Sequence, residues 1–250
     1  MSRNVLKICM RIAIPLAFWL GVWQLAAMAV DLELLLPSPV QVWTSLTALA
    51  GTDTFWLSAL FTLARVFAGL LGGTVLGGLL AFATHFSPFA GLLLAPAIRV
   101  VRATPVVSFI LLVYLWASRA NIPGVIAAMM VLPVVWGGLT AGLDGVDPQL
   151  LELARAYRFS RWKTLRLIYL PSLRPHFVSS FLTCFGLAWK SGVAAEVICP
   201  PRLAIGSRIQ QARLALETAD LFAWTLVIIV LSLALEGLLR RLLKGKGAAA

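Results

Sequence analysis

The sequence has little charge for its length. Only 12% of its 250 residues are Asp, Glu, Lys or Arg, whereas soluble domains average about 25%. Hydrophobic residues make up 60% of the chain, and the mean hydropathy is +0.93. These values exclude an ordinary globular enzyme and indicate a polytopic membrane protein.

Residues that commonly carry out chemistry are also scarce. The three cysteines, Cys9, Cys184 and Cys199, form neither a CxxC pair nor a metal-binding spacing. The sequence contains no GxxxxGK[ST] motif, so the chain is not expected to cradle the phosphates of ATP itself. We therefore expect no catalytic residue, no metal site and no cofactor in this chain.

Acidic residues are outnumbered, with 10 Asp and Glu against 21 Lys and Arg, which gives a net charge of +11. In a soluble protein this excess would suggest a nucleic-acid partner. In a membrane protein it is explained by the enrichment of Lys and Arg in cytoplasmic loops. The expected surroundings are therefore a lipid bilayer, without nucleic acid.

Long apolar runs suggest six membrane spans. They cover residues 12–30, 59–84, a stretch from after Arg102 to about Ser118, and then about 124–142, 175–195 and 222–239; about 20 apolar residues cross a bilayer. The first run is long for a signal peptide and lacks a cleavage-type ending, so we expect it to be retained.

The distribution of basic residues predicts the orientation. The N-terminal segment before the first run is basic, whereas the loop at residues 31–58 holds acidic residues and no Lys or Arg. The predicted outer segments hold four basic residues, Arg119, Arg202, Arg208 and Arg213, and most of the others lie on the predicted inner side. The pattern predicts an all-α protein with six transmembrane helices and both termini in the cytoplasm.

Proline and glycine mark two local features. Pro96 and Pro105 interrupt the third apolar region, which predicts a short helix, a break and then the span; Arg99 and Arg102 beside it are interpreted as anchors on the inner side. Glycines at helical spacing predict close packing between spans. These helix-packing glycines are Gly69, Gly73, Gly77, Gly138 and Gly142.

The longest polar segment runs from Asp147 to Pro171, between the fourth and fifth predicted spans. Asp147 is suited to cap a helix that has Pro148 at its first position. Leu150, Leu153, Ala154 and Tyr157 recur at helical spacing, so we expect this apolar stripe to lie on the membrane domain. Ser160 is a candidate cap for a second helical turn. The segment therefore predicts rigid short helices that face the cytoplasm.

This segment resembles the cytoplasmic loop of bacterial ABC importer permeases, which carries the pattern E-A-A-x3-G-x9-I-x-L-P. The chain has Glu152, Leu153 and Ala154, and Ile168, Leu170 and Pro171 at the matching distance, but Arg158 stands at the glycine position. Glycine there permits a left-handed turn, which costs another residue on the order of 1 kcal/mol. The resemblance implies a set of ATPase-coupling residues: Glu152, Leu153, Ala154, Tyr157, Arg158, Arg161, Ile168, Leu170 and Pro171.

The resemblance covers residues 54–241 and is most similar to nitrate, sulfonate and taurine permeases, for example in Trp189-Lys190 and Ala194-Ala195-Glu196. It implies a type I ABC importer permease domain at 54–241, preceded by an N-terminal segment at 1–53 and followed by a basic tail at 242–250. It also implies an inner-membrane homodimer that works with two cytoplasmic ATPase subunits, which bind ATP and Mg, and with an extracytoplasmic solute-binding protein. The implied substrate is a small anionic solute such as nitrate, a sulfonate or taurine.

Polar residues within the apolar runs are candidates for a translocation path. We select Thr104, Ser108, Trp136, Thr140, Trp189 and Lys190. Charged groups at membrane depth face protein or a water cavity, so Lys190 and Glu196 either lie near the path or form an internal ion pair. Hydroxyl groups in spans can instead bond to their own helix backbone.

Other functions compete with this prediction. An ion-coupled secondary transporter would carry internal repeats, and we see none between residues 12–118 and 124–241. A membrane scaffold would leave the capped cytoplasmic helix unexplained. A permease for a vitamin-like heterocycle remains a second possibility for the substrate.

Overall fold

The computed structural model describes the backbone of residues 2–244 and the side chains of residues 13–243, and every regular element in this part is helical. The predicted N-terminal basic side chains and most of the 242–250 tail lie outside the described side chains. The elements in chain order are α1 (Ser2–Val30), α2 (Pro39–Ala50), α3 (Asp53–Phe86), α4 (Pro88–Ala103), α5 (Val106–Tyr114), α6 (Ile122–Asp144), α7 (Pro148–Ala156), α8 (Arg161–Thr164), the π-helical turn η1 (Leu165–Tyr169), α9 (Leu170–Ile198), α10 (Ile205–Ala215) and α11 (Thr218–Lys244).

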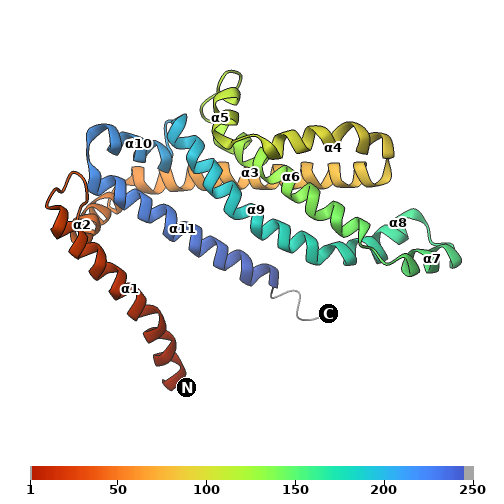
Figure 1. Cartoon of the computed structure of the whole chain (residues 1–250), viewed down its shortest axis with the longest axis horizontal. Coiled ribbons are helices and arrows are strands. Elements are labelled where there is room, and N and C mark those ends of the chain that lie inside the picture. The colour runs from red at the N-terminus through yellow and green to blue at the C-terminus, as the bar shows by residue number, and fades with distance from the viewer. Residues whose placement is uncertain (1, 245–250) are drawn as a thin grey trace.

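Helices α3 and α6 form the closest pair in the molecule (Figure 1). The glycines of α3 lie against the backbone of α6: a Cβ atom at Gly73 would be 2.6 Å from the carbonyl oxygen of Ala128, and one at Gly77 would be 2.6 Å from that of Leu132. Gly69 meets Gly124 in the same way. The absence of side chains at these positions therefore allows the two helices to pack backbone to backbone.

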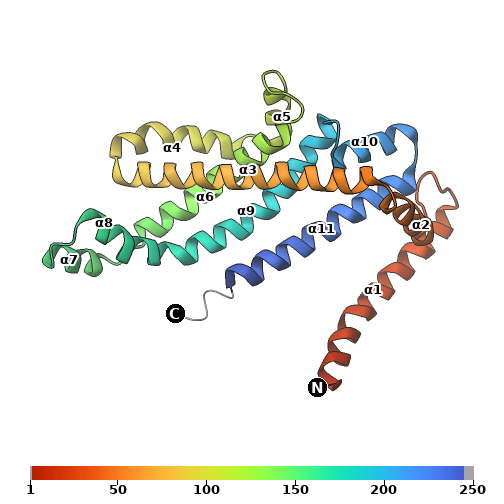
Figure 2. The same ribbon diagram turned by 180° about the vertical axis from the view of Figure 1, so that it is seen from behind.

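Helix α9 packs against both α6 and α3 and completes the core (Figure 2). Gly138 lies against Ser180, and Gly142 lies against Leu173 and His176. The buried apolar side chains of α3, α6 and α9 form one cluster around Phe185 and Trp189. These three helices are the frame that positions the loop and the polar residues described below.

The predicted third span takes a different form. α5 has nine residues, or about 14 Å, which is too short to cross a bilayer, and α4 and α5 are bent by 104° at their junction. The break predicted from Pro105 is present, because this residue follows the end of α4. Since α3 and α6 run parallel, the bent pair must carry the chain back between them, as a broken span or a re-entrant segment.

Two arginines that were interpreted as anchors on the inner side, Arg99 and Arg102, lie on α4 close to this bend. α4 turns back at Ser87 and runs alongside α3 (Figures 1 and 2). Arg99 and Arg102 are exposed near the far end of α4, so Arg102 lies about 20 Å from the α3–α4 turn. They therefore do not lie at the turn, where the anchor interpretation put them.

Two segments predicted as loops contain helices. α2 lies within the predicted 31–58 loop, because Ser38 accepts a hydrogen bond from the Gln41 N–H while the Gln41 side chain accepts one from the Ser38 N–H. The Pro37-Ser38-Pro39 sequence is thus a helix start. α10 lies within the predicted 196–221 segment. Both helices are at the same end of the molecule, which we call the α10 end (Figure 1).

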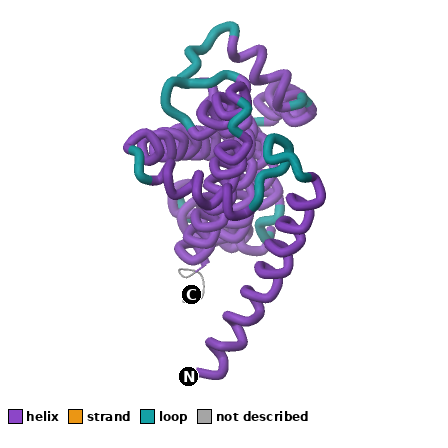
Figure 3. The backbone as a smooth tube through the Cα atoms, turned by 90° about the vertical axis from the view of Figure 1, so that its left-hand side faces the viewer, coloured by secondary structure: helices purple, strands orange, loops and turns teal. Residues whose placement is uncertain are grey.

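Five described helices are long and apolar enough to cross a membrane, or six if the α4–α5 pair counts as one span. The number of spans therefore agrees with the prediction only when the bent pair is included. α1 diverges from the bundle (Figure 3) and is held near its C-terminal end, where the Trp23 indole donates to the Pro37 carbonyl (3.1 Å) and stacks on Phe222 of α11.

Candidate functional site

The Asp147–Pro171 segment folds as two short helices at the end of the molecule opposite α10, which we call the loop end (Figure 1). The Asp147 carboxylate accepts a hydrogen bond from the Gln149 N–H (2.8 Å) at the start of α7, where Pro148 occupies the first position. The Ser160 hydroxyl accepts one from the Lys163 N–H (3.3 Å) at the start of α8. Both predicted caps are therefore confirmed.

Arg158 adopts the left-handed conformation that its position predicts for glycine, with φ at 50°. The turn after α7 is closed by two hydrogen bonds: the Phe159 N–H donates to the Ala154 carbonyl (2.8 Å), and the Arg158 N–H donates to the Arg155 carbonyl (3.0 Å). This pair of bonds defines a Schellman motif, which usually has glycine at this point. The chain thus keeps the turn in spite of the arginine.

The apolar stripe of α7 does not lie on the membrane domain as expected. Ala154 is buried against Val146 and Ile168, but Leu153 is 52% exposed and Tyr157 is 72% exposed. Leu150 is also exposed. Helical periodicity identified the apolar face correctly, but a periodic pattern does not say whether the covering surface belongs to the same chain.

The Glu152 carboxylate lies on the exposed side of α7 and has no hydrogen bond or ion pair with any described residue. Basic side chains surround this part of the loop, and Lys163 lies 4.1 Å above the Phe159 ring. Arg161 and Arg155 border a pocket of about 630 Å³ between α7, α8 and Tyr169. Leu170 and Pro171 are exposed at the start of α9. The loop end therefore presents apolar and charged groups together, on a rigid backbone.

Three of the selected path residues lie in or beside the core. Trp189 is 2% exposed and stacks on Phe185. The Trp136 indole donates to the Thr84 hydroxyl (3.0 Å), which ties α6 to α3. The Thr140 hydroxyl is buried without a partner among the described residues. Within one copy of the chain, Trp136 thus links α6 to α3 and Trp189 packs in the core.

The other three lie nearer the surface. Thr104 is at the α4–α5 break, where its hydroxyl donates to the Val100 carbonyl (2.8 Å), and Ser108 is exposed in the first turn of α5. Lys190 is exposed on α9 and makes no ion pair with a described residue. The six residues therefore lie on three parts of the fold: the α4–α5 bend with the start of α5, α6, and α9.

A buried ion pair at the α10 end was one of two alternatives for Glu196, but its partner was not predicted. The Glu196 carboxylate, which is fully buried, lies 3.3 Å from the Arg65 guanidinium and accepts hydrogen bonds from the Thr62 hydroxyl (2.8 Å) and the Gly206 N–H (3.2 Å). Arg65 also donates to the Leu203 carbonyl (2.7 Å). These contacts fasten α10 to α3 and α9.

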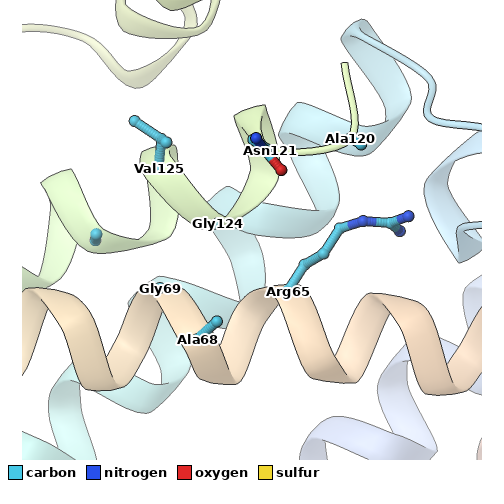
Figure 4. A pocket seen from close by; sticks show the side chains of 8 residues that line it. Arg65, Ala68, Gly69, Ala120, Asn121, Gly124 and Val125 are labelled. Atoms are coloured by element: carbon cyan, nitrogen blue, oxygen red, sulfur yellow. The ribbon is translucent and has the colours of Figure 1, made fainter. Parts of the chain in front are cut away.

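The Arg65 side chain is thus directed at Glu196 and the Leu203 carbonyl and is 17% exposed. Figure 4 shows its side chain leaving α3 beside a pocket of about 290 Å³, whose other walls include Asn121 and Gly124. The available signal in the sequence was the presence of one acidic and one basic residue in otherwise apolar runs. A single sequence does not show that they meet, because they are 131 positions apart.

Together, the spans and the capped loop define a polytopic membrane protein whose sequence contains no GxxxxGK[ST] nucleotide-binding motif. Residues 73–246 match the family described as the inner membrane component of binding-protein-dependent transport systems. The chain belongs to this family and is the permease subunit of a binding-protein-dependent ABC importer, located in the inner membrane. ATP hydrolysis in such a system falls to a separate ATPase.

Individual relatives differ in what they transport. The chain is 27% identical to the taurine transport system permease protein of Escherichia coli (strain K12), over 97% of this chain and 89% of that protein. It is 27% identical to a riboflavin transport system permease protein of Chloroflexus aurantiacus, over 84% of this chain and 79% of that protein. It is 24% identical to a nitrate import permease protein of Synechococcus elongatus, over 73% of this chain and 69% of that protein. The family match removes the alternative of an ion-coupled secondary transporter.

Proposed function

We propose that two copies of this chain form the translocation path for a small anionic solute, and that Asp147–Pro171 docks on a cytoplasmic ATPase subunit. The proposal places the loop end and both termini in the cytoplasm and the α10 end outside. The excess of basic residues on the loop side supports this orientation. The solute would arrive at the α10 end from an extracytoplasmic binding protein.

The exposed face of α7 is the observation that carries the docking proposal. Leu153 and Tyr157 are large apolar side chains that nothing in the described chain covers, and Glu152 beside them has no described partner. Leaving apolar area in water costs about 25 cal/mol per Å², and the two caps and the Schellman turn hold this area rigid. A partner surface with an apolar groove and a basic group would satisfy all three side chains.

The coupling follows from this geometry. ATP and Mg bind to the partner ATPase pair, whose closure would draw the two α7–α8 segments inward. Because α6 and α9 continue directly from this loop, the spans would tilt and open the path toward the binding protein. A partner that binds one of two conformations more tightly shifts the population toward it.

The substrate class rests on the relatives. The relatives named for taurine, aliphatic sulfonates and nitrate transport solutes that are anions or carry an anionic group. The riboflavin relative is the reason to keep a vitamin-like heterocycle as the alternative substrate. An uptake panel of nitrate, ethanesulfonate, taurine and riboflavin, with the complete importer in proteoliposomes, separates the two. Import of riboflavin without any of the anions would refute the proposed class.

Glu152→Lys tests the docking role. The change reverses the charge at the centre of the exposed face, so we expect at least a tenfold loss of ATPase co-purification and of ATP-driven uptake. Glu217→Lys is the matched control for ATPase co-purification, because Glu217 is also an exposed carboxylate but lies at the α10 end, away from the loop. Normal co-purification and uptake by Glu152→Lys would rule out docking through this face.

A further inference from the structure

Lys190 is a cationic side chain deep within an unbroken membrane helix. It lies about 12 Å along α9 before its end at Ile198, and the neighbouring Gly192 packs on Val66, which is about 20 Å into α3. The hydrocarbon core is about 30 Å thick, so both positions put Lys190 within it. An ammonium group at this depth requires water or an anion.

The exposed face of α9 around Lys190 is unlike a lipid-facing surface. Most exposed or half-buried residues along it are small or polar, namely Ser179, Thr183, Gly186, Lys190 and Ala194, and Leu187 is the exposed large apolar side chain next to Lys190. A Cβ atom at Gly186 would meet nothing within 4 Å. By contrast, α11 exposes large apolar side chains such as Val230 and Leu233. This face of α9 therefore suits an aqueous or polar surface better than lipid.

The protein supplies no carboxylate to neutralise Lys190. Glu196 is the only acidic residue within α9, and it is fully buried and paired with Arg65. Of the other nine acidic residues, Glu236 lies in the C-terminal half of α11 and pairs with Arg240, and the rest lie at the ends of membrane helices, in the short helix α7 or in connecting segments. A second copy related by a twofold axis along the membrane normal would place the same residues at the same depths, so it would supply no partner either.

The direction of the side chain also disfavours an escape to the membrane surface. In an α-helix the Cα–Cβ bond tilts toward the N-terminus, so the side chain of Lys190 leans toward Leu170, about 30 Å away. The nearer surface, at Ile198, lies in the opposite direction. Snorkelling to the headgroups would therefore work against the geometry of the helix.

We infer that Lys190 faces the water-filled path and binds the anionic group of the transported solute, which makes it a residue that selects for negative charge. This inference rests on the proposed function, because it requires the path and an anionic cargo. Two copies would place two ammonium groups at one depth. Their combined charge would favour sulfonates, nitrate or similar anions over neutral solutes of the same size.

Lys190→Cys, modified with methanethiosulfonate reagents, tests both parts of the inference in the complete importer. All variants carry Cys9→Ser, and the remaining Cys184 and Cys199 are buried. Val230→Cys is the control, because Val230 is 55% exposed on α11 among large apolar side chains such as Leu233, a surface that suits lipid. A membrane-impermeant charged reagent should modify the thiol of Lys190→Cys at least tenfold faster than that of Val230→Cys. Equal rates would overturn the path-facing position.

Uptake of ethanesulfonate and nitrate then tests the role of the charge. Lys190→Cys should lose at least tenfold in uptake and keep ATPase co-purification. The aminoethyl reagent, which restores an ammonium group, should recover uptake at least fivefold, whereas the sulfonatoethyl reagent should not. Lys190→Arg should stay within about threefold of the unmodified protein and shows that the position tolerates a folded cationic variant.

The outcomes separate the two proposals. If the unmodified importer takes up the anions and Lys190→Cys does so equally well, the inference about Lys190 fails and the proposed function stands. Recovery by both reagents alike would also overturn it, because size and not charge would then matter. If the unmodified importer takes up riboflavin alone, the proposed substrate class fails and the inference falls with it.

Discussion

The contact between α3 and α6 allows a sharp comparison between two adjacent glycines. A Cβ atom at Gly73 would lie 2.6 Å from the carbonyl oxygen of Ala128 and 2.9 Å from its Cα atom, whereas a Cβ atom at Gly72 would meet nothing within 4 Å. Gly73→Ala must therefore push two backbones apart. Overpacking of this kind costs typically 1–3 kcal/mol, while the gain in helix propensity, about 1 kcal/mol, applies to both substitutions.

We expect Gly73→Ala to be less stable than Gly72→Ala by about 1–3 kcal/mol. At about 2–4 °C per kcal/mol for a chain of this size, the difference in Tm is roughly 2–12 °C. Thermal unfolding of the purified protein in detergent, followed by tryptophan fluorescence, measures it. If the two variants melt within 1 °C of each other, the backbone contact between α3 and α6 is not as described.

Two further substitutions test the turn and the buried pair. Arg158→Gly removes the strain of an arginine in the left-handed conformation, which stabilises the folded protein by about 1 kcal/mol. Because glycine also gains conformational freedom in the unfolded chain, the expected rise in Tm is about 1–3 °C. Arg155→Gly, within α7, should lower Tm. Glu196→Gln leaves the Arg65 guanidinium without its counter-charge and should cost about 3 kcal/mol, seen as a lower Tm. Arg65→Met combined with Glu196→Met should recover part of this loss, and no recovery would contradict the pairing.

Local signals in the sequence predicted the loop well. Asp147 and Ser160 cap helices because their side chains reach free N–H groups only a few residues ahead. The resemblance to the permease loop, which has glycine at the position of Arg158, indicated a left-handed turn there but left open whether an arginine would keep it; the structure shows that it does. These features depend on neighbours within a few turns of the chain, so a single sequence contains the information.

Features that depend on distant contacts were not predictable in the same way. Pro105 marked the α4–α5 break, but the 104° bend depends on how α4 packs along α3. Leu153 and Tyr157 were expected to be buried because a periodic apolar face is normally covered, but the described part of the chain leaves them 52% and 72% exposed. The pair of Arg65 and Glu196 likewise required the fold that brings α3 and α9 together.

Helix α9 connects all three polar regions. It is unbroken from Leu170 to Ile198, so the start of the helix beside the loop, Lys190 in its C-terminal half and Glu196 near its end must move together. The π-helical turn from Leu165 to Tyr169 lies directly between α8 and α9, and such turns frequently occur at functional sites. If the loop docks on an ATPase, a displacement of α8 would act on this turn first. The turn would then either bend and absorb the movement or transmit it to α9. A rigid α9 would then reposition Lys190 and, through Glu196, the attached α10, so the path and the surface facing the binding protein would change in one step.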